Sequence, residues 1–211
     1  MISCIPTPTR RVLCLAGSLR HASWNRRLLR AAAEQAPATL QLDVYHALSS
    51  VPLFDEDLEQ RDPTGPVGVQ ALRTAIAAAD GLLVATPEYN QSIPGVLKNA
   101  LDWLSRESPD GDVLAARPVA VLGASSGPWG TRLAQASLRQ VLHTCSALVM
   151  PAPTLFVANA ASRFDPDGTL TDFTTIQSLQ NFMLAFERWM ERMAPPAQPA
   201  TQLEPATCAL R

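Results

Sequence analysis

The stretch that decides the fold is GLLVATPEYNQSIPGVLKNALDW, residues 81–103. It begins with small and apolar residues typical of a buried strand, passes through a polar and aromatic turn, and continues with apolar residues at helical spacing. The turn places an aromatic ring, a carboxylate and an amide where a strand ends. In an open parallel sheet, ligands bind in the crevice outside the carboxyl ends of the strands. We therefore expect a ligand site at this turn.

The same alternation of short apolar runs and helical patterns extends along most of the chain. It predicts strands at 11–16, 40–45, 81–85, 118–123 and 147–157, the last interrupted by Pro151 and Pro153 because proline cannot donate to a ladder. It predicts helices at about 25–35, 67–79, 94–105, 130–144 and 174–193. Strands that alternate with helices predict an α/β fold, and the right-handedness of nearly all parallel crossovers limits the possible strand orders. This fold is a flavodoxin-like, doubly wound, five-stranded parallel sheet with strand order 2-1-3-4-5 and helices on both faces.

Length and composition indicate one globular domain. The chain has 211 residues, of which 47% are hydrophobic and 17% charged, enough to bury a sizeable core. We expect an N-terminal extension over residues 1–10, the domain over 11–193 and a tail over 194–211. The tail combines prolines with small and polar residues, so we expect it to be disordered.

Several classes of function are disfavoured by the same composition. The net charge of −2 leaves no basic surplus for nucleic acid or an anionic membrane. No apolar run approaches the ~20 residues that cross a bilayer, and the first residues do not resemble a signal peptide. The four cysteines, Cys4, Cys14, Cys145 and Cys208, have neither CxxC nor metal-ligand spacing. We therefore expect a cytoplasmic protein with no metal site and no membrane partner.

The loop after the first strand, residues 17–25, is suited to a phosphate. It lies before the first turn of a helix, where free N–H groups and the helix dipole favour an anion. Ser18, Ser23 and Asn25 add short polar side chains, and Arg20 adds a charged fork. The loop is neither a Walker A motif nor a G-x-G-x-x-G turn. The alternative is that Ser23 or Asn25 merely caps the helix.

Two further loops follow the third and fourth strands. In the first, Tyr89 is placed to flank a flat heterocycle while backbone amides near Glu88 and Asn90 bond its edge; the alternative is a turn with Tyr89 in a subunit contact. In the second, residues 123–130, small residues let the backbone approach a ligand closely; the alternative is a plain turn. Together with the phosphate loop, these walls indicate a mononucleotide with a ring system, such as FMN, rather than ATP.

The three loops, taken in order, resemble the NADPH-dependent FMN reductase family, which includes flavodoxin-like quinone, chromate and azo-dye reductases. The matching motifs are Gly17-Ser18-x-Arg20-x-x-Ser23-x-Asn25, then the Pro87–Trp103 stretch, then Gly123-Ala124-Ser125-x-Gly127. The resemblance spans about residues 12–149, and its middle motif is highly specific.

The resemblance implies non-covalent FMN binding, in a homodimer or homotetramer. By position it assigns Ser18, Arg20, Ser23 and Asn25 to the phosphate, Pro87, Glu88, Tyr89 and Asn90 to the isoalloxazine and ribityl chain, and Ser125 and Gly127 to the far side. Trp129 departs from the family pattern, in which small residues are common there. We expect it to narrow the substrate pocket.

The activity that the resemblance implies is hydride transfer from NADPH, or from NADH, to flavin N5, followed by reduction of a quinone or similar acceptor in a ping-pong cycle. Chromate, an azo compound and free flavin are such acceptors. The flavin carries this chemistry, so we assign no catalytic acid, base or nucleophile. The alternative is a flavodoxin-like electron carrier or regulatory FMN-binding module without NAD(P)H turnover. The near-neutral charge favours the enzyme, because electron-carrier flavodoxins are strongly acidic.

Overall fold

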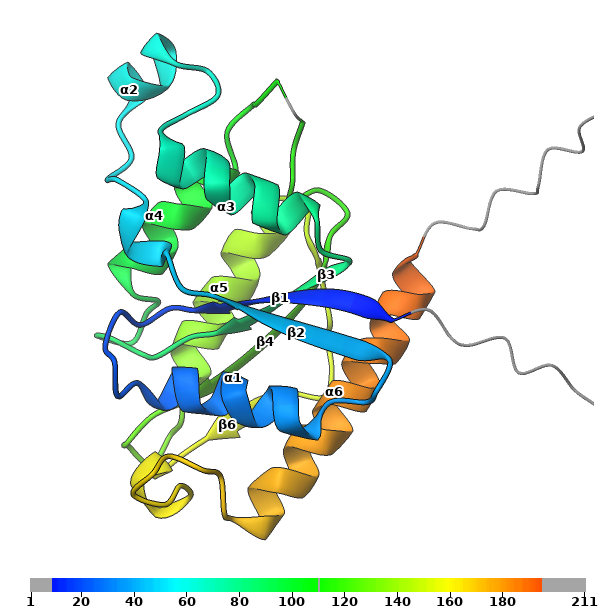
Figure 1. Cartoon of the computed structure of the whole chain (residues 1–211). Helices are drawn as coiled ribbons and strands as arrows, with labels where there is room; N and C mark the ends of the chain where they lie inside the picture. The colour runs from blue at the N-terminus through cyan, green and yellow to red at the C-terminus, as the bar shows by residue number, and fades with distance from the viewer. Residues whose placement is uncertain (1–8, 110, 195–211) are drawn as a thin grey trace, which may run out of the picture.

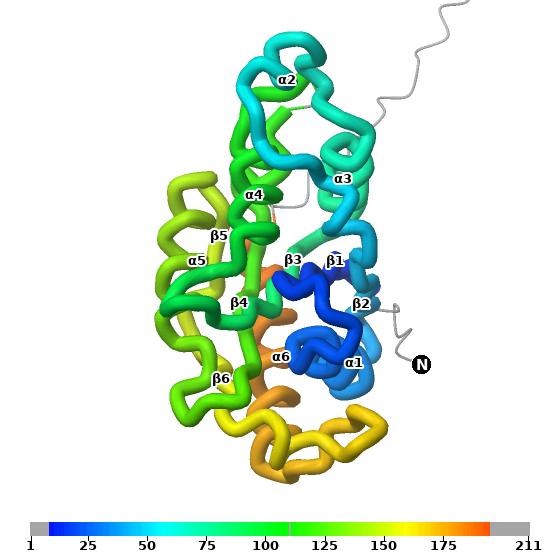
Figure 2. Tube along the Cα trace, turned by 90° about the vertical axis from the view of Figure 1, so that its left-hand side faces the viewer, coloured from blue at the N-terminus to red at the C-terminus, as the bar shows by residue number. Residues whose placement is uncertain are grey.

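A twisted parallel sheet lies at the centre of the computed structural model, which describes residues 9–109 and 111–194 (Figure 1). Its strands are ordered β2-β1-β3-β4-β5, as expected. Their bounds are β1 Arg10–Ala16, β2 Leu40–Tyr45, β3 Gly81–Ala85, β4 Pro118–Ala124 and β5 Leu148–Val149. All the pairings are parallel, so the carboxyl ends of the strands lie along one edge. Figure 2 looks onto that edge.

Helices cover both faces of the sheet. On one face lie α1 Trp24–Gln35 and α6 Phe173–Met193; on the other lie α3 Val67–Ala77, α4 Gly95–Leu104 and α5 Arg132–Thr144 (Figure 1). Two short 3-10 turns, η1 Leu48–Ser50 and η2 Ala160–Ser162, complete the connections. The expected flavodoxin-like α/β fold is therefore confirmed.

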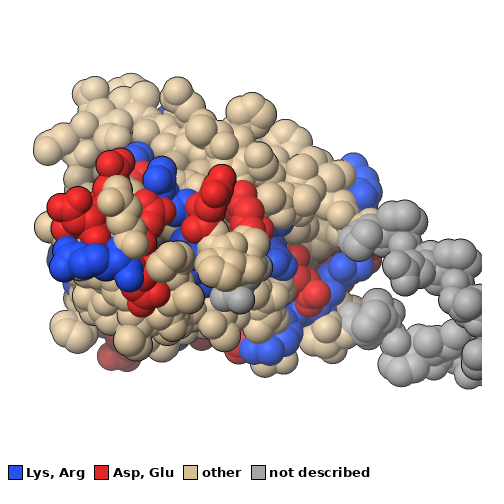
Figure 3. Space-filling view, turned by 90° about the horizontal axis from the view of Figure 1, so that it is seen from above, with Lys and Arg blue, Asp and Glu red and all other residues tan. Residues whose placement is uncertain are grey.

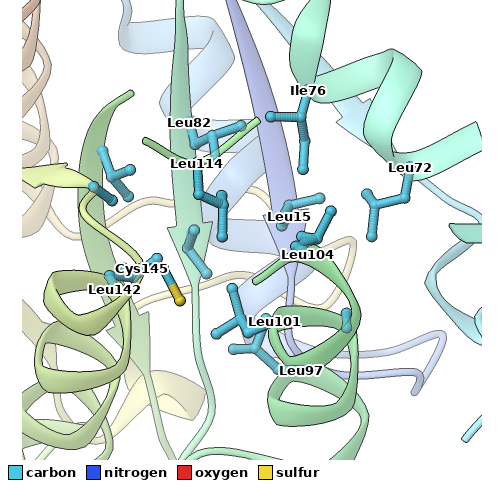
Figure 4. Packing of buried hydrophobic residues seen from close by; sticks show 14 of the residues in the cluster. Leu15, Leu72, Ile76, Leu82, Leu97, Leu101, Leu104, Leu114, Leu142 and Cys145 are labelled. Atoms are coloured by element: carbon cyan, nitrogen blue, oxygen red, sulfur yellow. The ribbon is translucent and has the colours of Figure 1, made fainter. Parts of the chain in front are cut away.

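The strands alternate between two apolar cores. In β1, Leu13 and Leu15 pack toward α3 and α4, whereas Val12 and Cys14 pack toward α1 and α6. Figure 4 shows the first of these cores, with leucines from the sheet meeting leucines from the helices that cover it. Because both faces of the central strands are buried, the strands read as continuous apolar runs.

The fifth strand is divided in two, as the prolines in its sequence predict. β5 pairs with β4 at Pro118 and Val119, and a second short strand, β6 Leu155–Val157, pairs with β4 at 122–124. Pro151 and Pro153 lie between the two and cannot donate to the ladder. The second half thereby returns to the carboxyl end of β4, beside the third loop of the candidate site.

The acidic connection between β2 and α3 contains a helix that the sequence pattern did not predict. This helix, α2 Glu56–Arg61, begins after Asp55, whose carboxylate accepts the N–H of Asp57 at 2.9 Å. Acidic residues in its first turn and Arg61 in its last suit the helix dipole. Figure 3, seen from this end of the molecule, shows acidic and basic side chains gathered together. Glu59 pairs there with Arg106 at 2.8 Å.

The first and last elements of the described chain are β1 and α6. β1 begins at Arg10, one residue inside the range expected for the extension, and α6 ends at Met193. The expectations for residues 1–8 and for 195–211 of the tail fall outside the described residues. Within the described ranges, no helix has the length and apolar character that a membrane crossing requires.

Candidate functional site

The loops after β1, β3 and β4 meet at the carboxyl edge of the sheet and enclose a cavity of about 250 Å³. This cavity, called here the cofactor cavity, is lined by Ser18, Arg20, Ser23, Trp24, Asn25, Pro87, Glu88, Tyr89, Ala124, Ser125, Ser126 and Gly127. Every residue assigned from the sequence to the cofactor is among them except Asn90. The three segments, at residues 18–25, 87–89 and 124–127, therefore form one concave site.

The loop after β1 provides donors for an anion. Ser23 is the N-cap of α1, and its hydroxyl accepts the N–H of Asn25 at 3.2 Å. The helix has no acidic residue in its first turn, so its positive dipole end is not compensated from within that turn. The remaining N–H groups of the turn have no intrahelical acceptor. Ser18 is buried with its hydroxyl facing the N–H of Arg20 at 3.4 Å.

Arg20 is the cation of this loop. It is exposed at the cavity, and its guanidinium forms no ion pair within the part of the chain that the structure describes. An arginine with no carboxylate partner keeps its bidentate fork available for a phosphate. The phosphate contact that the sequence assigns to Arg20 stays a prediction.

Asn25 holds two loops together. It is 2% exposed, its Nδ2 donates to the carbonyl of Ala124 at 3.0 Å, and its Oδ1 accepts the N–H of Ala124 at 2.9 Å. One side chain thus joins the start of α1 to the end of β4, across ninety-nine residues of sequence. Asn25 lines the cavity as expected, but both polar atoms of its amide are already engaged by the protein.

Glu88 joins the second loop to α5. Its Oε2 accepts the N–H groups of Leu133 and Ala134 at 2.9 and 3.0 Å. The N-cap of α5, Thr131, makes no side-chain capping bond, so a carboxylate from another loop satisfies the first turn instead. The helix dipole of α5 is thereby compensated by the protein, which leaves the start of α1 as the anion-binding end.

Tyr89 and Asn90 occupy a tight turn. Tyr89 and Ser92 exchange two backbone hydrogen bonds of 3.0 Å, and Asn90 and Gln91 between them both have positive φ angles, 50° and 62°. The turn presents Tyr89 at the cavity with 47% of its surface exposed. Asn90 lies at the tip of the turn, outside the cavity lining.

The third loop is fixed by backbone contacts. The Ser125 hydroxyl donates to the carbonyl of Gly130 at 2.8 Å, and the N–H of Ser125 donates to Val157 of β6 at 3.0 Å. Gly123 is required by a close approach, since a Cβ there would lie 2.4 Å from the carbonyl oxygen of Thr86. Trp129, expected to narrow the substrate pocket, is 70% exposed and outside the cavity lining.

Trp24 and Ser126 are lining residues that sequence reasoning did not assign to the cofactor. Trp24 Nε1 donates to the hydroxyl of Ser126 at 3.2 Å, which closes the cavity between the first and third loops. Both residues stand inside motifs already singled out, Trp24 between Ser23 and Asn25. Their position inside these motifs is the sequence signal that could have identified them as lining residues.

The cysteines of the described chain are not reactive groups of the site. Cys14 lies in β1 with no exposed surface, and its burial raises the pKa of the thiol far above its usual range. Burial also raises the pKa of Cys145. Within residues 9–109 and 111–194 no cluster of three or more histidine, cysteine or acidic side chains is placed to hold a metal.

The donor set of the cofactor cavity fits a phosphorylated flavin. Hydroxyls, first-turn N–H groups and an unpaired guanidinium stand at one side, which suits a phosphate dianion. Pro87, Tyr89 and the Ala124–Gly127 backbone form flat, weakly polar walls at the other, which suits an aromatic ring system. FMN would be held by these groups without a covalent bond.

Comparison with known proteins agrees with this geometry. The family model for NADPH-dependent FMN reductase matches residues 10–162. A 2-hydroxy-1,4-benzoquinone reductase from a Burkholderia species is 39% identical over 181 residues, covering 85% of this chain and 96% of the relative. An NAD(P)H-dependent FMN reductase from Pseudomonas aeruginosa is 38% identical over 183 residues, covering 87% and 96%.

A solved structure agrees as well. FerB from Paracoccus denitrificans, a flavoenzyme NAD(P)H:(acceptor) oxidoreductase, superposes with a TM-score of 0.79 at 34% identity. The match covers 88% of this chain and 99% of FerB. Three loops that converge on one cavity, a family model that spans them and full-length relatives lead to one conclusion: the chain belongs to the NADPH-dependent FMN reductase family and is an FMN- and NAD(P)H-dependent oxidoreductase.

Proposed function

We propose that this enzyme is an NAD(P)H:quinone oxidoreductase that uses FMN as its bound cofactor and follows a ping-pong cycle. The observation that carries the proposal is the cofactor cavity, with an unpaired Arg20 beside the free first turn of α1 and flat walls opposite. When bound, FMN supplies a flavin N5 that accepts hydride from a nicotinamide.

In this proposal the residues of the chain bind FMN and orient it. Arg20, the hydroxyls of Ser18 and Ser23 and the N–H groups of the first turn of α1 hold the phosphate, which fixes the cofactor at one end. Pro87 and Tyr89 contact the ring system, and the 124–127 backbone closes the opposite side. Asn25 and Glu88 act through these loops, since each ties a loop to a neighbouring element.

A quinone acceptor is supported by the relatives and by the openness of the site. The Burkholderia relative is named for a benzoquinone substrate. Tyr89 stands half exposed at the cavity, so a second flat ring has an aromatic surface to contact there. Chromate, azo compounds and free flavin remain acceptors to compare with quinones in the same assay.

Steady-state kinetics test the proposal. Initial rates of NADPH oxidation are measured over a grid of NADPH and benzoquinone concentrations, with the FMN-loaded protein. A ping-pong cycle gives parallel double-reciprocal lines, because nicotinamide leaves before the acceptor enters. Intersecting lines contradict the ping-pong order. Absence of quinone-dependent turnover contradicts the acceptor.

We also propose that the enzyme assembles as a homodimer or homotetramer, which the family resemblance implies. Three large apolar side chains on the second and third loops and the start of α5 support this: Tyr89, Trp129 and Leu133 are 47%, 70% and 50% exposed. Sedimentation equilibrium distinguishes such an assembly from a monomer.

A further inference from the structure

A second cavity lies beside the cofactor cavity and is strongly basic. It has a volume of about 400 Å³ and is lined by His21, Ala22, Arg26, Arg27, Arg30 and Asp167. Three guanidiniums and one carboxylate therefore face one hollow, in a protein whose net charge is −2. We call it the arginine cavity.

The three arginines are held in place without being neutralised. Arg26 Nε donates to the carbonyl of Ser18 at 3.4 Å, Arg27 lies over the Trp24 ring at 4.7 Å from its centre, and Arg30 Nη2 donates to the carbonyl of Gly168 at 2.5 Å. None of them forms an ion pair with a carboxylate of the described chain. These contacts orient the guanidiniums and leave their charge available.

The turn that contains Asp167 and Gly168 packs closely against Arg27 and Arg30. Gly168 has a φ of +86°, and a Cβ at this position would lie 2.7 Å from Arg27 Nε. Glycine therefore lets the Asp165–Gly168 turn close on α1, where Arg30 bonds it. Asp167 is exposed and its carboxylate makes no hydrogen bond or ion pair within the described chain. The charge in the cavity is therefore only partly offset.

The arginine cavity and the cofactor cavity share a wall. Ser18 and Trp24 line the cofactor cavity, and they are the partners of Arg26 and Arg27, which line the arginine cavity. A ligand with one end against the bound flavin can therefore place an anionic group at its other end in the arginine cavity. A dianionic phosphomonoester is the group that three arginine forks recognise best.

We propose that the arginine cavity binds the 2′-phosphate of NADPH and so makes NADPH, rather than NADH, the preferred hydride donor. The proposal rests on the proposed NAD(P)H oxidoreductase function. It assigns Arg26, Arg27 and Arg30 to nucleotide specificity, a role distinct from that of Arg20, which faces the cofactor phosphate.

Binding of adenosine 2′,5′-bisphosphate to the FMN-loaded protein, measured by calorimetry, tests the proposal without requiring turnover. Adenosine 5′-monophosphate, which lacks the 2′-phosphate, is the paired probe. We expect the bisphosphate to bind the wild type about tenfold more tightly than the monophosphate, because its 2′-phosphate adds charge-assisted hydrogen bonds to the arginines. The bisphosphate should also compete with NADPH in the steady-state assay.

Three variants sharpen the test. Arg30→Gln should weaken bisphosphate binding about five- to tenfold and leave monophosphate binding unchanged. Asp167→Asn should tighten bisphosphate binding about twofold, because it removes the carboxylate that faces the site. Arg188→Gln, an exposed arginine on α6 away from both cavities, is the matched control and should change neither affinity.

The outcomes separate the two proposals. Equal binding of both probes to the wild type, or unchanged bisphosphate binding in both Arg30→Gln and Asp167→Asn, overturns the assignment of the arginine cavity. Tight bisphosphate binding that does not compete with NADPH overturns it too, since it reveals a site for free phosphomonoesters. Failure of the FMN-loaded protein to oxidise either nucleotide contradicts the proposed function, whatever the probes show.

Discussion

Arg20 connects the charge of a single residue to the affinity for the cofactor. It is exposed at the cofactor cavity and has no carboxylate partner in the described chain, so no ion pair has to break when a phosphate binds. We expect Arg20→Ala to weaken FMN binding by about 1.5–3 kcal/mol, roughly tenfold to more than a hundredfold. Fluorescence titration of the apoprotein with FMN measures this change.

Riboflavin provides the control for Arg20, because it has the same ring system and no phosphate. Its affinity should be the same for the wild type and for Arg20→Ala. Equal losses for FMN and riboflavin would show that Arg20 supports the loop and does not contact the phosphate.

Asn25 makes a different contribution at the same scale, because its amide is used inside the protein. In Asn25→Asp, a carboxylate oxygen would replace the Nδ2 that donates to the Ala124 carbonyl, and a buried charge would face an acceptor. We expect a loss of about 3 kcal/mol in the free energy of unfolding. Urea denaturation measures this loss. An unchanged midpoint would mean that the hydrogen bonds between Asn25 and Ala124 do not stabilise the fold.

The two roles show what could be predicted from the sequence at this scale. Residue type and position before a helix were enough to predict that Ser18, Arg20 and Ser23 line one cavity. They were not enough to distinguish a ligand contact from a structural contact for Asn25 or Glu88. Their partners, Ala124 and the start of α5, lie far away in sequence and become neighbours only through the sheet order.

At the scale of elements, α5 depends on a cap supplied by a loop. Because Glu88 accepts two first-turn N–H groups, Glu88→Ala should destabilise the protein by about 1 kcal/mol and weaken FMN binding, since the loop that carries Tyr89 loses its anchor. Glu88→Gln keeps an acceptor oxygen and should recover most of both losses. Thermal unfolding and FMN titration of the two variants test this; identical behaviour of Ala and Gln would contradict the cap.

The N-terminus of α6 has a pH-dependent cap. Hydrogen bonds from the Thr175 hydroxyl and N–H, and then from Arg163, lower the pKa of Asp172 from its ordinary value of 3.8. Because the folded pKa is the lower one, the cap stabilises the fold fully above the ordinary value and loses this effect as pH falls through the lowered pKa. The difference in Tm between the wild type and Asp172→Asn should therefore stay constant down to roughly pH 4 and shrink as the pH falls further. A difference that stays constant with pH would contradict this assignment.

Some element boundaries could be predicted from the residues themselves, and others could not be predicted from the apolar pattern. Prolines predicted the interruption of the fifth strand, because the missing N–H is a property of the residue itself. The helix α2 was missed, since its signals are a cap and charges rather than an apolar face. The start of α5 at Arg132 rather than near Gly130 follows from the positive φ of Gly130, which no apolar pattern records.

At the scale of the whole molecule, the parallel sheet is what turns three short motifs into one site. The order β2-β1-β3-β4-β5 places the loops of β1, β3 and β4 next to one another, and the two apolar cores hold the sheet rigid behind them. Neither the phosphate loop nor the aromatic turn forms a cavity alone. We therefore expect the converged loops to bind FMN in a position where NAD(P)H reduces it.

The visible spectrum of the purified protein, recorded before and after anaerobic addition of NADPH, tests that claim most directly. We expect a flavin absorption band that NADPH bleaches, and a flavin released by heat that is identified as FMN. A colourless protein that takes up no added FMN, or a flavin band that neither NADPH nor NADH changes, would contradict it.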